Sequence, residues 1–184
     1  GYTYIDSGAM YRAVALYALR RGWVTEDDID KEALKQHIQE IHITFRTNEQ
    51  GQQETYLNGE NVEKEIRSLE VGNAASRIST LDFVRREMVR QQQEMGKEKG
   101  VVMDGRDIGT VVFPEAELKI FLTASPETRA LRRFNELKEQ GEEVTYEEVF
   151  ANIKERDERD SNRSQSPVRK ADDAIELDNS NLTV

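Results

Sequence analysis

The chain has 184 residues, a length that fits one domain carrying a small insertion. Its hydrophobic fraction is 36% and its charged fraction 34%, and no stretch approaches the roughly 20 apolar residues that cross a bilayer, so we expect no membrane partner. The absence of cysteine excludes a disulfide framework and a thiolate metal site. Since no charged and then apolar leader is present, we expect a cytoplasmic location.

The net charge is -10, which opposes attraction to a nucleic-acid backbone, so we expect no nucleic-acid partner. Of the 26 basic residues, 17 are arginine, the residue suited to forked contacts with phosphate. An acidic chain with concentrated arginines indicates a small phosphorylated ligand.

The first predicted elements are a strand over residues 2–5 and a helix over residues 9–21, which Gly22 ends and which we expect to pack on a sheet. Asp6-Ser7-Gly8 forms the turn between them. A hydroxyl and backbone amides at a helix start can bind an anion, and Arg12 lies close enough to reach it. The alternative is that Asp6 or Ser7 only caps the helix and that Arg12 is solvated.

Residues 38–77 resemble a small antiparallel insert, because apolar and polar residues alternate near position 43 and Asn58-Gly59 is a strong hairpin signal. The α/β pattern then resumes with a helix over residues 81–95. Ser76 and Arg85 could offer a hydroxyl and a guanidinium to a planar base, although small residues near Ser76 are also typical of close helix packing.

The segment VVMDGRDIG is the most informative part of the chain. We expect residues 101–103 to form a buried strand, and Asp104, Arg106 and Asp107 follow it directly. Parallel α/β sheets place chemistry at the carboxyl ends of their strands, so this cluster indicates a phosphate-and-metal site. The alternative is a solvated loop in which these charges pair with one another.

Another buried strand is predicted over residues 118–122. Ser125-Pro126 predicts a helix that Gly141 closes, and Thr145 with Glu148 predicts a capping box.

The capped helix should run over residues 146–160, with a charged final part that cannot lie in a core. Arg156, Asp160 and Arg163 would share one face with Arg159 beside it, so the helix could close over a phosphate as a lid; an ion-paired solvent face is the alternative. A last strand is expected over residues 174–177.

The motifs YIDSGAMYRA, EIRS with NAAS, DGRDIGTVVFP, KIFLTASPETRALRR and IKERDERDSNRSQSP with ADDAIELD together resemble the bacterial cytidylate kinases, in the same order and with similar gaps. The resemblance implies an α/β fold: a parallel-sheet nucleoside-monophosphate kinase core, a small antiparallel β insert and a helical lid. It places the core in residues 1–37 and 78–184, the monophosphate-binding insert in 38–77 and the lid within 131–163.

The resemblance further implies transfer of the γ-phosphoryl group of ATP to CMP or dCMP with Mg²⁺, by a monomer. It assigns a catalytic role to four arginines, Arg106, Arg156, Arg159 and Arg163, and substrate contacts to Ser7, Tyr11, Arg12, Ser76, Arg85, Asp107 and Asp160. Within this set, Arg12, Arg106 and Arg163 would hold the acceptor phosphate, and Ser76, Arg85 and Asp107 would read the cytosine. Asp160 and Arg156 would face the sugar. Asp104 would orient the magnesium shell through water.

The chain departs from the family pattern because it contains no GxxxxGK[ST] phosphate loop and stops soon after Leu177. We therefore expect a fragment or an incompletely recorded chain that is inactive alone. The alternatives are a kinase for UMP or dTMP, and an inactive nucleotide-binding module that has lost its phosphate loop.

Overall fold

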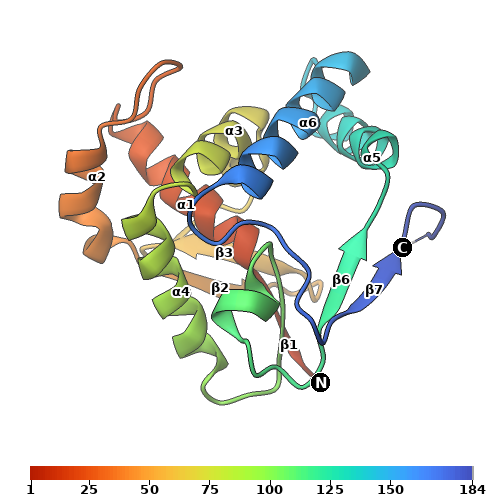
Figure 1. The fold of residues 1–184 in the computed structure, drawn as a ribbon. Coiled ribbons are helices and arrows are strands. Elements are labelled where there is room, and N and C mark those ends of the chain that lie inside the picture. Colours follow the sequence, from red (N-terminus) through yellow and green to blue (C-terminus); the bar gives the residue numbers. More distant parts are fainter. Residues whose placement is uncertain (184) are drawn as a thin grey trace. The chain divides into compact units, whose positions relative to one another are not determined.

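The computed structural model describes residues 1–183, and these form two compact units, residues 1–105 and residues 106 onward. The first unit contains β1 (Thr3–Asp6), α1 (Ser7–Arg20), α2 (Lys31–His37), β2 (Ile43–Thr47), β3 (Gln53–Leu57), β4 (Glu60–Asn61), α3 (Leu69–Ile78), α4 (Asp82–Gly96) and β5 (Val101–Asp104), with short 3₁₀ helices η1 (Ile38–Glu40) and η2 (Glu65–Arg67) (Figure 1). The second contains the π-helix η3 (Ile108–Val112), β6 (Ile120–Thr123), α5 (Pro126–Glu139), α6 (Tyr146–Asn162) and β7 (Ile175–Asp178).

Helix α1 is the centre of the first unit. Its side chains from Ala9 to Ala18 are largely buried, and alanines at positions 13, 15 and 18 leave room for neighbouring helices to approach closely. The predicted helix is confirmed, and Gly22 follows it with a φ of 72°, the left-handed conformation that ends helices at glycine.

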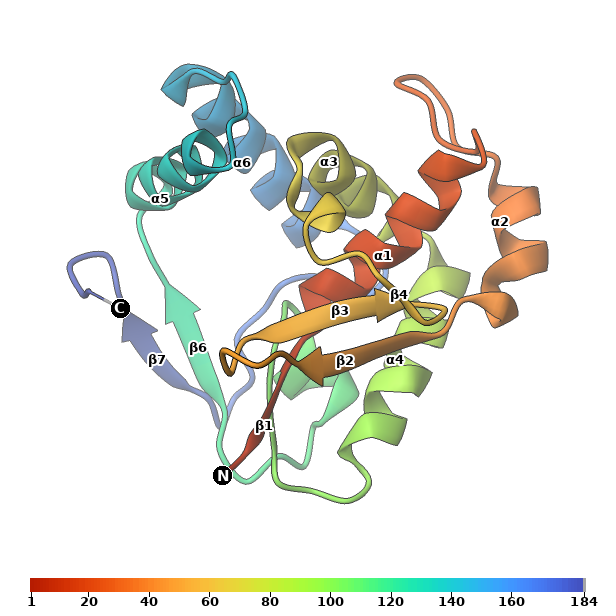
Figure 2. The ribbon, with the colours of Figure 1, turned by 180° about the vertical axis from the view of Figure 1, so that it is seen from behind.

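The predicted antiparallel segment is confirmed as the sheet β2-β3-β4 (Figure 2). Asn58 and Gly59 have φ values of 48° and 85°, as a type I′ turn between β3 and β4 requires. Ile43 and Leu57 are buried in the same core as α1, so this sheet packs on the first helix of the chain. The predicted limits of insert, core and lid stay predictions.

Strands β1 and β5 pair in parallel, from Thr3 opposite Val101 to Asp6 opposite Asp104. The expectation that residues 101–103 are wholly buried is wrong, because Val102 is 52% exposed. Val101 and Met103 pack against the core and Val102 faces away from it, which is the alternation of a sheet covered on one face.

In the second unit, α5 and α6 lie side by side as a helical hairpin (Figure 1). Ser125 caps α5 with Pro126 in its first turn, and Thr145 and Glu148 form the predicted capping box of α6. The Arg129 guanidinium makes two hydrogen bonds, of 2.9 and 2.8 Å, to the Asp157 carboxylate and so fastens the two helices together.

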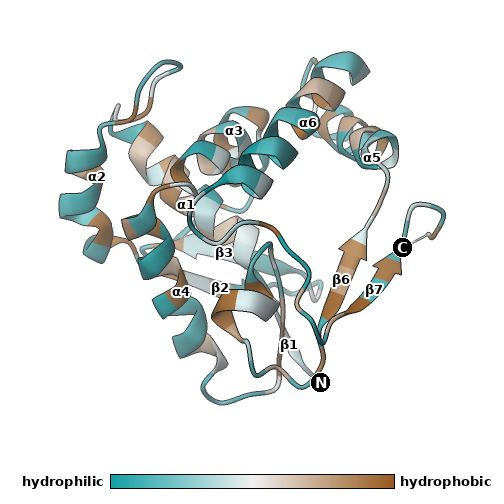
Figure 3. Ribbon diagram, in the orientation of Figure 1, coloured by the Kyte–Doolittle hydropathy of each residue, from teal (hydrophilic) through white to brown (hydrophobic). Residues whose placement is uncertain are grey.

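Strands β6 and β7 form a parallel pair. Both strands are rich in apolar residues, which are brown in Figure 3. The expectation of a buried strand over residues 118–122 is wrong, because the aliphatic side chains of this region are exposed: Leu118, Ile120, Leu122, Ile175 and Leu177. The apolar pattern correctly predicted strands, but a pattern alone does not specify which faces other elements cover. The predicted α/β class is confirmed, and none of the helices in residues 1–183 has the length and hydrophobicity that crossing a membrane requires.

Candidate nucleotide-binding site

The start of α1 brings together several predicted residues. Asp6 caps the helix by accepting a hydrogen bond from the amide of Ala9 (3.0 Å), as the capping alternative predicted. The Ser7 hydroxyl donates to the carbonyl of Asp104 (2.6 Å) and so joins the helix start to the end of β5. Arg12 does not simply extend into solvent, because its guanidinium donates to the carbonyl of Ile66 (2.9 Å).

Tyr11, Ser76 and Arg85 contribute to the packing of α1, α3 and α4. Arg85 is only 4% exposed; it donates to the carbonyl of Ser79 (2.9 Å), and its guanidinium carbon lies 5.1 Å from the ring centre of Tyr11. Ser76 is buried on α3. A guanidinium held by a carbonyl and an aromatic face keeps a fixed orientation, which recognition of a planar base requires.

Asp104 lies at the carboxyl end of β5, where its carboxylate accepts a hydrogen bond from the Tyr4 hydroxyl (2.8 Å). Burial, and secondly the nearby Asp6, raise the pKa of Asp104, while Tyr4 and Arg67 oppose this shift. No cluster of three or more potential metal-ligating side chains occurs among the described residues. One carboxylate still fits Mg²⁺ beside a nucleotide, because this ion usually takes one or two carboxylates and completes its shell with phosphates and water.

The second unit holds a cluster of charges around Asp160. Arg106 contacts one carboxylate oxygen of Asp160 (2.9 Å) and Arg163 the other (3.2 Å). Asp160 is 2% exposed and the Arg163 side chain 4% exposed, whereas the Arg106 side chain remains 40% exposed. One buried carboxylate therefore orients two guanidinium groups, of which one is open to solvent.

The charged end of α6 stays outside the hydrophobic core, as expected: Asp160 is the one buried residue of this part, and Arg106 and Arg163 neutralise it. The expectation that Arg163 lies on the helical face is wrong, because α6 ends at Asn162 and Arg163 is its C-cap residue with an extended backbone. Its guanidinium still reaches Asp160, and it also donates to the carbonyl of Ser166 (2.7 Å).

Arg156 adds further positive charge to the cluster. Burial, and secondly repulsion from Arg106, lower the pKa of Arg156 to about 10. Its Nε has no hydrogen-bond partner among the described residues. Arg159, by contrast, pairs with Glu155 (2.7 Å) one turn before it. Asp160 and Asp157 oppose the lowering of the Arg156 pKa, so Arg156 is a half-buried guanidinium that nearby carboxylates neutralise only in part, an arrangement that suits the binding of an anion.

Asp107 does not lie in a solvated loop. It is buried, and its carbonyl, directly before η3, accepts hydrogen bonds from the amides of Val111 (2.9 Å) and Val112 (3.2 Å) at the end of that helix. The solvated-loop alternative is therefore wrong for this residue.

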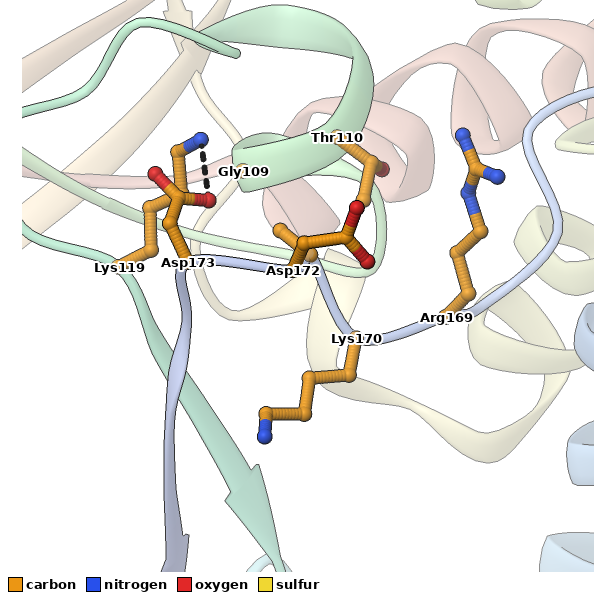
Figure 4. Close-up of a pocket in the computed structure, with 8 residues that line it drawn as sticks. Gly109, Thr110, Lys119, Arg169, Lys170, Asp172 and Asp173 are labelled. Atoms are coloured by element: carbon orange, nitrogen blue, oxygen red, sulfur yellow. Dashed lines mark hydrogen bonds and ion pairs between the residues drawn. The ribbon is translucent and has the colours of Figure 1, made fainter.

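A cavity of about 240 Å³ lies elsewhere in the second unit, lined by Gly109, Thr110, Lys119, Arg169, Lys170, Ala171, Asp172 and Asp173 (Figure 4). Lys119 pairs with Asp173 across it (2.9 Å), and the side chains of Arg169 and Lys170 point away from each other. Its cations do not converge, and it contains none of the predicted site residues.

The sequence reasoning missed three residues that hold Asp6 and Asp104 in place at the start of α1, namely Tyr4, Glu63 and Arg67. Arg67 pairs with both Asp6 (3.1 Å) and Glu63 (2.7 Å). Its only signal was its place in the EIRS motif, directly before the residue that caps α3. Partners 61 positions apart, such as Arg67 and Asp6, leave no local pattern.

Comparison with known proteins identifies the family of the chain. The chain is 62% identical over 185 residues to the cytidylate kinase of Bacteroides thetaiotaomicron, with 100% of this chain and 81% of that protein covered. Identity to the cytidylate kinases of Parabacteroides distasonis and Flavobacterium psychrophilum is 60% over 185 residues and 53% over 184, with the same shares covered. The family model for cytidylate kinase matches residues 1–184, and the chain therefore belongs to the cytidylate kinase family of phosphotransferases.

Proposed function

We propose that the protein transfers the γ-phosphoryl group of ATP to CMP or dCMP, producing ADP and CDP or dCDP. Membership of the cytidylate kinase family supports the nucleoside monophosphate as acceptor. The observation that carries the proposal is the arrangement around Asp160, where two guanidinium groups are fixed on one carboxylate and a third cation remains under-neutralised. The positive charges repel one another in the ligand-free protein, and a bound phosphate would neutralise them.

The acceptor phosphate would be held by Arg12, Arg106 and Arg163. The cytosine would be read by Ser76, Arg85 and Asp107, and the sugar would face Asp160 and Arg156. Ser7 and Tyr11 would complete the acceptor contacts at the start of α1, and Arg159 would join the lid arginines. These roles rest on the family motifs and on the fixed orientations of Arg12, Arg85 and Arg163.

The chemistry needs little general-base help, because an oxygen of the acceptor phosphate is already a competent nucleophile. Positioning and charge neutralisation therefore supply the rate acceleration. Mg²⁺, when bound, neutralises charge on the donor phosphates. Asp104 would hold it through water, with Tyr4 orienting the carboxylate. The arginines at the end of α6 would exclude water from the transferring group and so suppress ATP hydrolysis.

A preference for cytosine would follow from the carboxylate of Asp107, which accepts hydrogen bonds and cannot donate them when ionised. Cytosine carries an amino donor at the position where uracil carries a carbonyl, so a carboxylate favours cytosine. We expect phosphorylation of CMP and dCMP, and much slower phosphorylation of UMP and dTMP, in a substrate panel with ATP. Faster turnover of UMP or dTMP would favour the alternative acceptor instead.

The catalytic assignment is tested by Arg163→Ala in the intact protein. Loss of this guanidinium should lower kcat by roughly 100-fold or more, because charge stabilisation of the transferring group is lost. Arg169→Ala is the matched control, since Arg169 is exposed and lies six positions later. Steady-state kinetics that show near-normal turnover for Arg163→Ala would remove Arg163 from the mechanism.

A further inference from the structure

We propose that Arg67 is a positioning residue for the acceptor phosphate: it fastens η2 to the start of α1 and thereby holds Arg12 in its phosphate-binding orientation. The inference rests on the proposed function, because it takes Arg12 as a phosphate ligand. Arg67 itself is assigned no contact with the nucleotide.

The guanidinium of Arg67 bridges two carboxylates, that of Asp6 at the end of β1 and that of Glu63 in the turn between β4 and η2. Both terminal nitrogens donate to one oxygen of Asp6 (3.1 and 3.2 Å), and the Nε and one terminal nitrogen donate to Glu63 (3.0 and 2.7 Å). The other oxygen of Asp6 caps α1, and the other oxygen of Glu63 accepts from the amide of Thr55 in β3 (3.0 Å). The bridge therefore runs from the antiparallel sheet to the N-terminus of α1.

Arg12 is held by the residue next to this bridge. Its guanidinium donates to the carbonyl of Ile66, which directly precedes Arg67 in η2. On its other side lies α3, where a Cβ added at Gly72 would come within 3.4 Å of both terminal nitrogens of Arg12. The position of η2 thus determines where the guanidinium of Arg12 lies.

An arginine is needed for this bridge. Its planar fork engages two carboxylates at once with directed hydrogen bonds, whereas a lysine is a single flexible point charge. The side chains of Arg67, Asp6 and Glu63 are each less than a third exposed, so solvent only partly screens the pairs.

A double-mutant cycle on the intact protein tests the inference. CMP affinity is measured by titration calorimetry, without a donor nucleotide, for Arg67→Ala, Arg12→Ala and the double variant. Because Arg67 acts through Arg12, Arg67→Ala should weaken CMP binding about tenfold alone and cause no further loss in the Arg12→Ala background. Full additivity of the two losses, or an affinity within about twofold of wild type for Arg67→Ala, overturns the inference.

Arg90→Ala provides the matched control. Arg90 also pairs with a carboxylate, Glu87 (2.6 Å), but both residues lie in α4 and neither belongs to η2 or α1. The variant should lower the melting temperature and leave CMP affinity unchanged; an equal loss of affinity would reduce Arg67 to a structural role. Arg67→Lys should show most of the loss of CMP affinity seen in Arg67→Ala. Wild-type affinity in Arg67→Lys would refute the need for an arginine that bridges two carboxylates. Unchanged CMP affinity in Arg12→Ala alone would instead reject the acceptor assignment.

Discussion

At the scale of single residues, the site contains a cation that the folded protein does not neutralise well. Arg156 is held beside Arg106 with its pKa lowered to about 10, chiefly by burial, and its Nε lacks a hydrogen-bond acceptor in the described part of the chain. Residues arranged for ligand binding often reduce the stability of the empty protein in this way.

Replacing this cation by an apolar side chain of similar length should separate stability from function. We expect Arg156→Met to stabilise the ligand-free protein by roughly 1 kcal/mol, because it removes a desolvated and repelled charge, while CMP phosphorylation falls steeply. Thermal unfolding and kinetics measure both effects, with Arg169→Met as the exposed control. A lower melting temperature together with normal turnover would contradict this account of Arg156.

Glu87 shows the opposite electrostatic situation. Hydrogen bonds from Arg90 lower its pKa, with further donation from Gln91 and Gln39 opposing the penalty of burial. A carboxyl whose pKa is lowered by folding stabilises the fold above its unfolded pKa of about 4.3, and this stabilisation is lost as the pH falls through the folded value.

We therefore expect Glu87→Gln to destabilise the protein by about 1 kcal/mol at pH 7, and the difference from wild type to vanish under acidic conditions. Urea unfolding at several pH values measures it. Glu94→Gln is the control, since its pair with Lys97 is exposed and should contribute little. If Glu87→Gln destabilised the protein equally in acid, the charge of Glu87 would not be the source of its contribution to stability.

At the scale of elements, two glycines illustrate how backbone conformation and packing place different demands on the same residue type. Gly59 has a φ of 85° in the β3-β4 turn and an open space where a Cβ would lie, so its conformation alone requires glycine. Gly72 lies in α3 without a positive φ, and a Cβ there would be in ordinary contact with Arg12.

Alanine should accordingly have opposite effects at these two sites. Gly59→Ala should destabilise the protein by about 1 kcal/mol, because a side chain in the left-handed region is strained. Gly72→Ala should be neutral or stabilising by up to about 1 kcal/mol, because alanine favours the helix. Chemical denaturation measures the free energy of unfolding of both variants. Destabilisation by Gly72→Ala would mean that the Arg12 side chain cannot shift to make room for the added methyl group.

At the scale of the whole molecule, what could be predicted from sequence was what short-range interactions determine. The caps at Ser125 and Thr145 and the turn at Asn58-Gly59 each depend on residues within a few positions, and all were predicted correctly. The strands at 101–103 and 118–122 were found, but their burial was wrong, since coverage depends on elements remote in sequence.

The same distinction applies to the candidate site. The motifs named its residues, and the roles assigned to them stay predictions. The buried pairing of Asp160 with Arg106 and the bridge of Arg67 to Asp6 span more than 50 positions each, so no periodicity or spacing could reveal them. Long-range ion pairs of this kind require coordinates.

The pairing of β1 with β5 constrains the order in which the first unit can be completed. Tyr4 and Asp104, which meet through a hydrogen bond at the end of these strands, are 100 positions apart. During synthesis the ribosome must release nearly the whole first unit before β1 gains its neighbour, and contacts of such separation slow folding. In the nascent chain, the hairpin and the helices are therefore made before Asp104, and we expect the ends of β1 and β5, with Tyr4 and Asp104, to be among the last parts of the first unit to form.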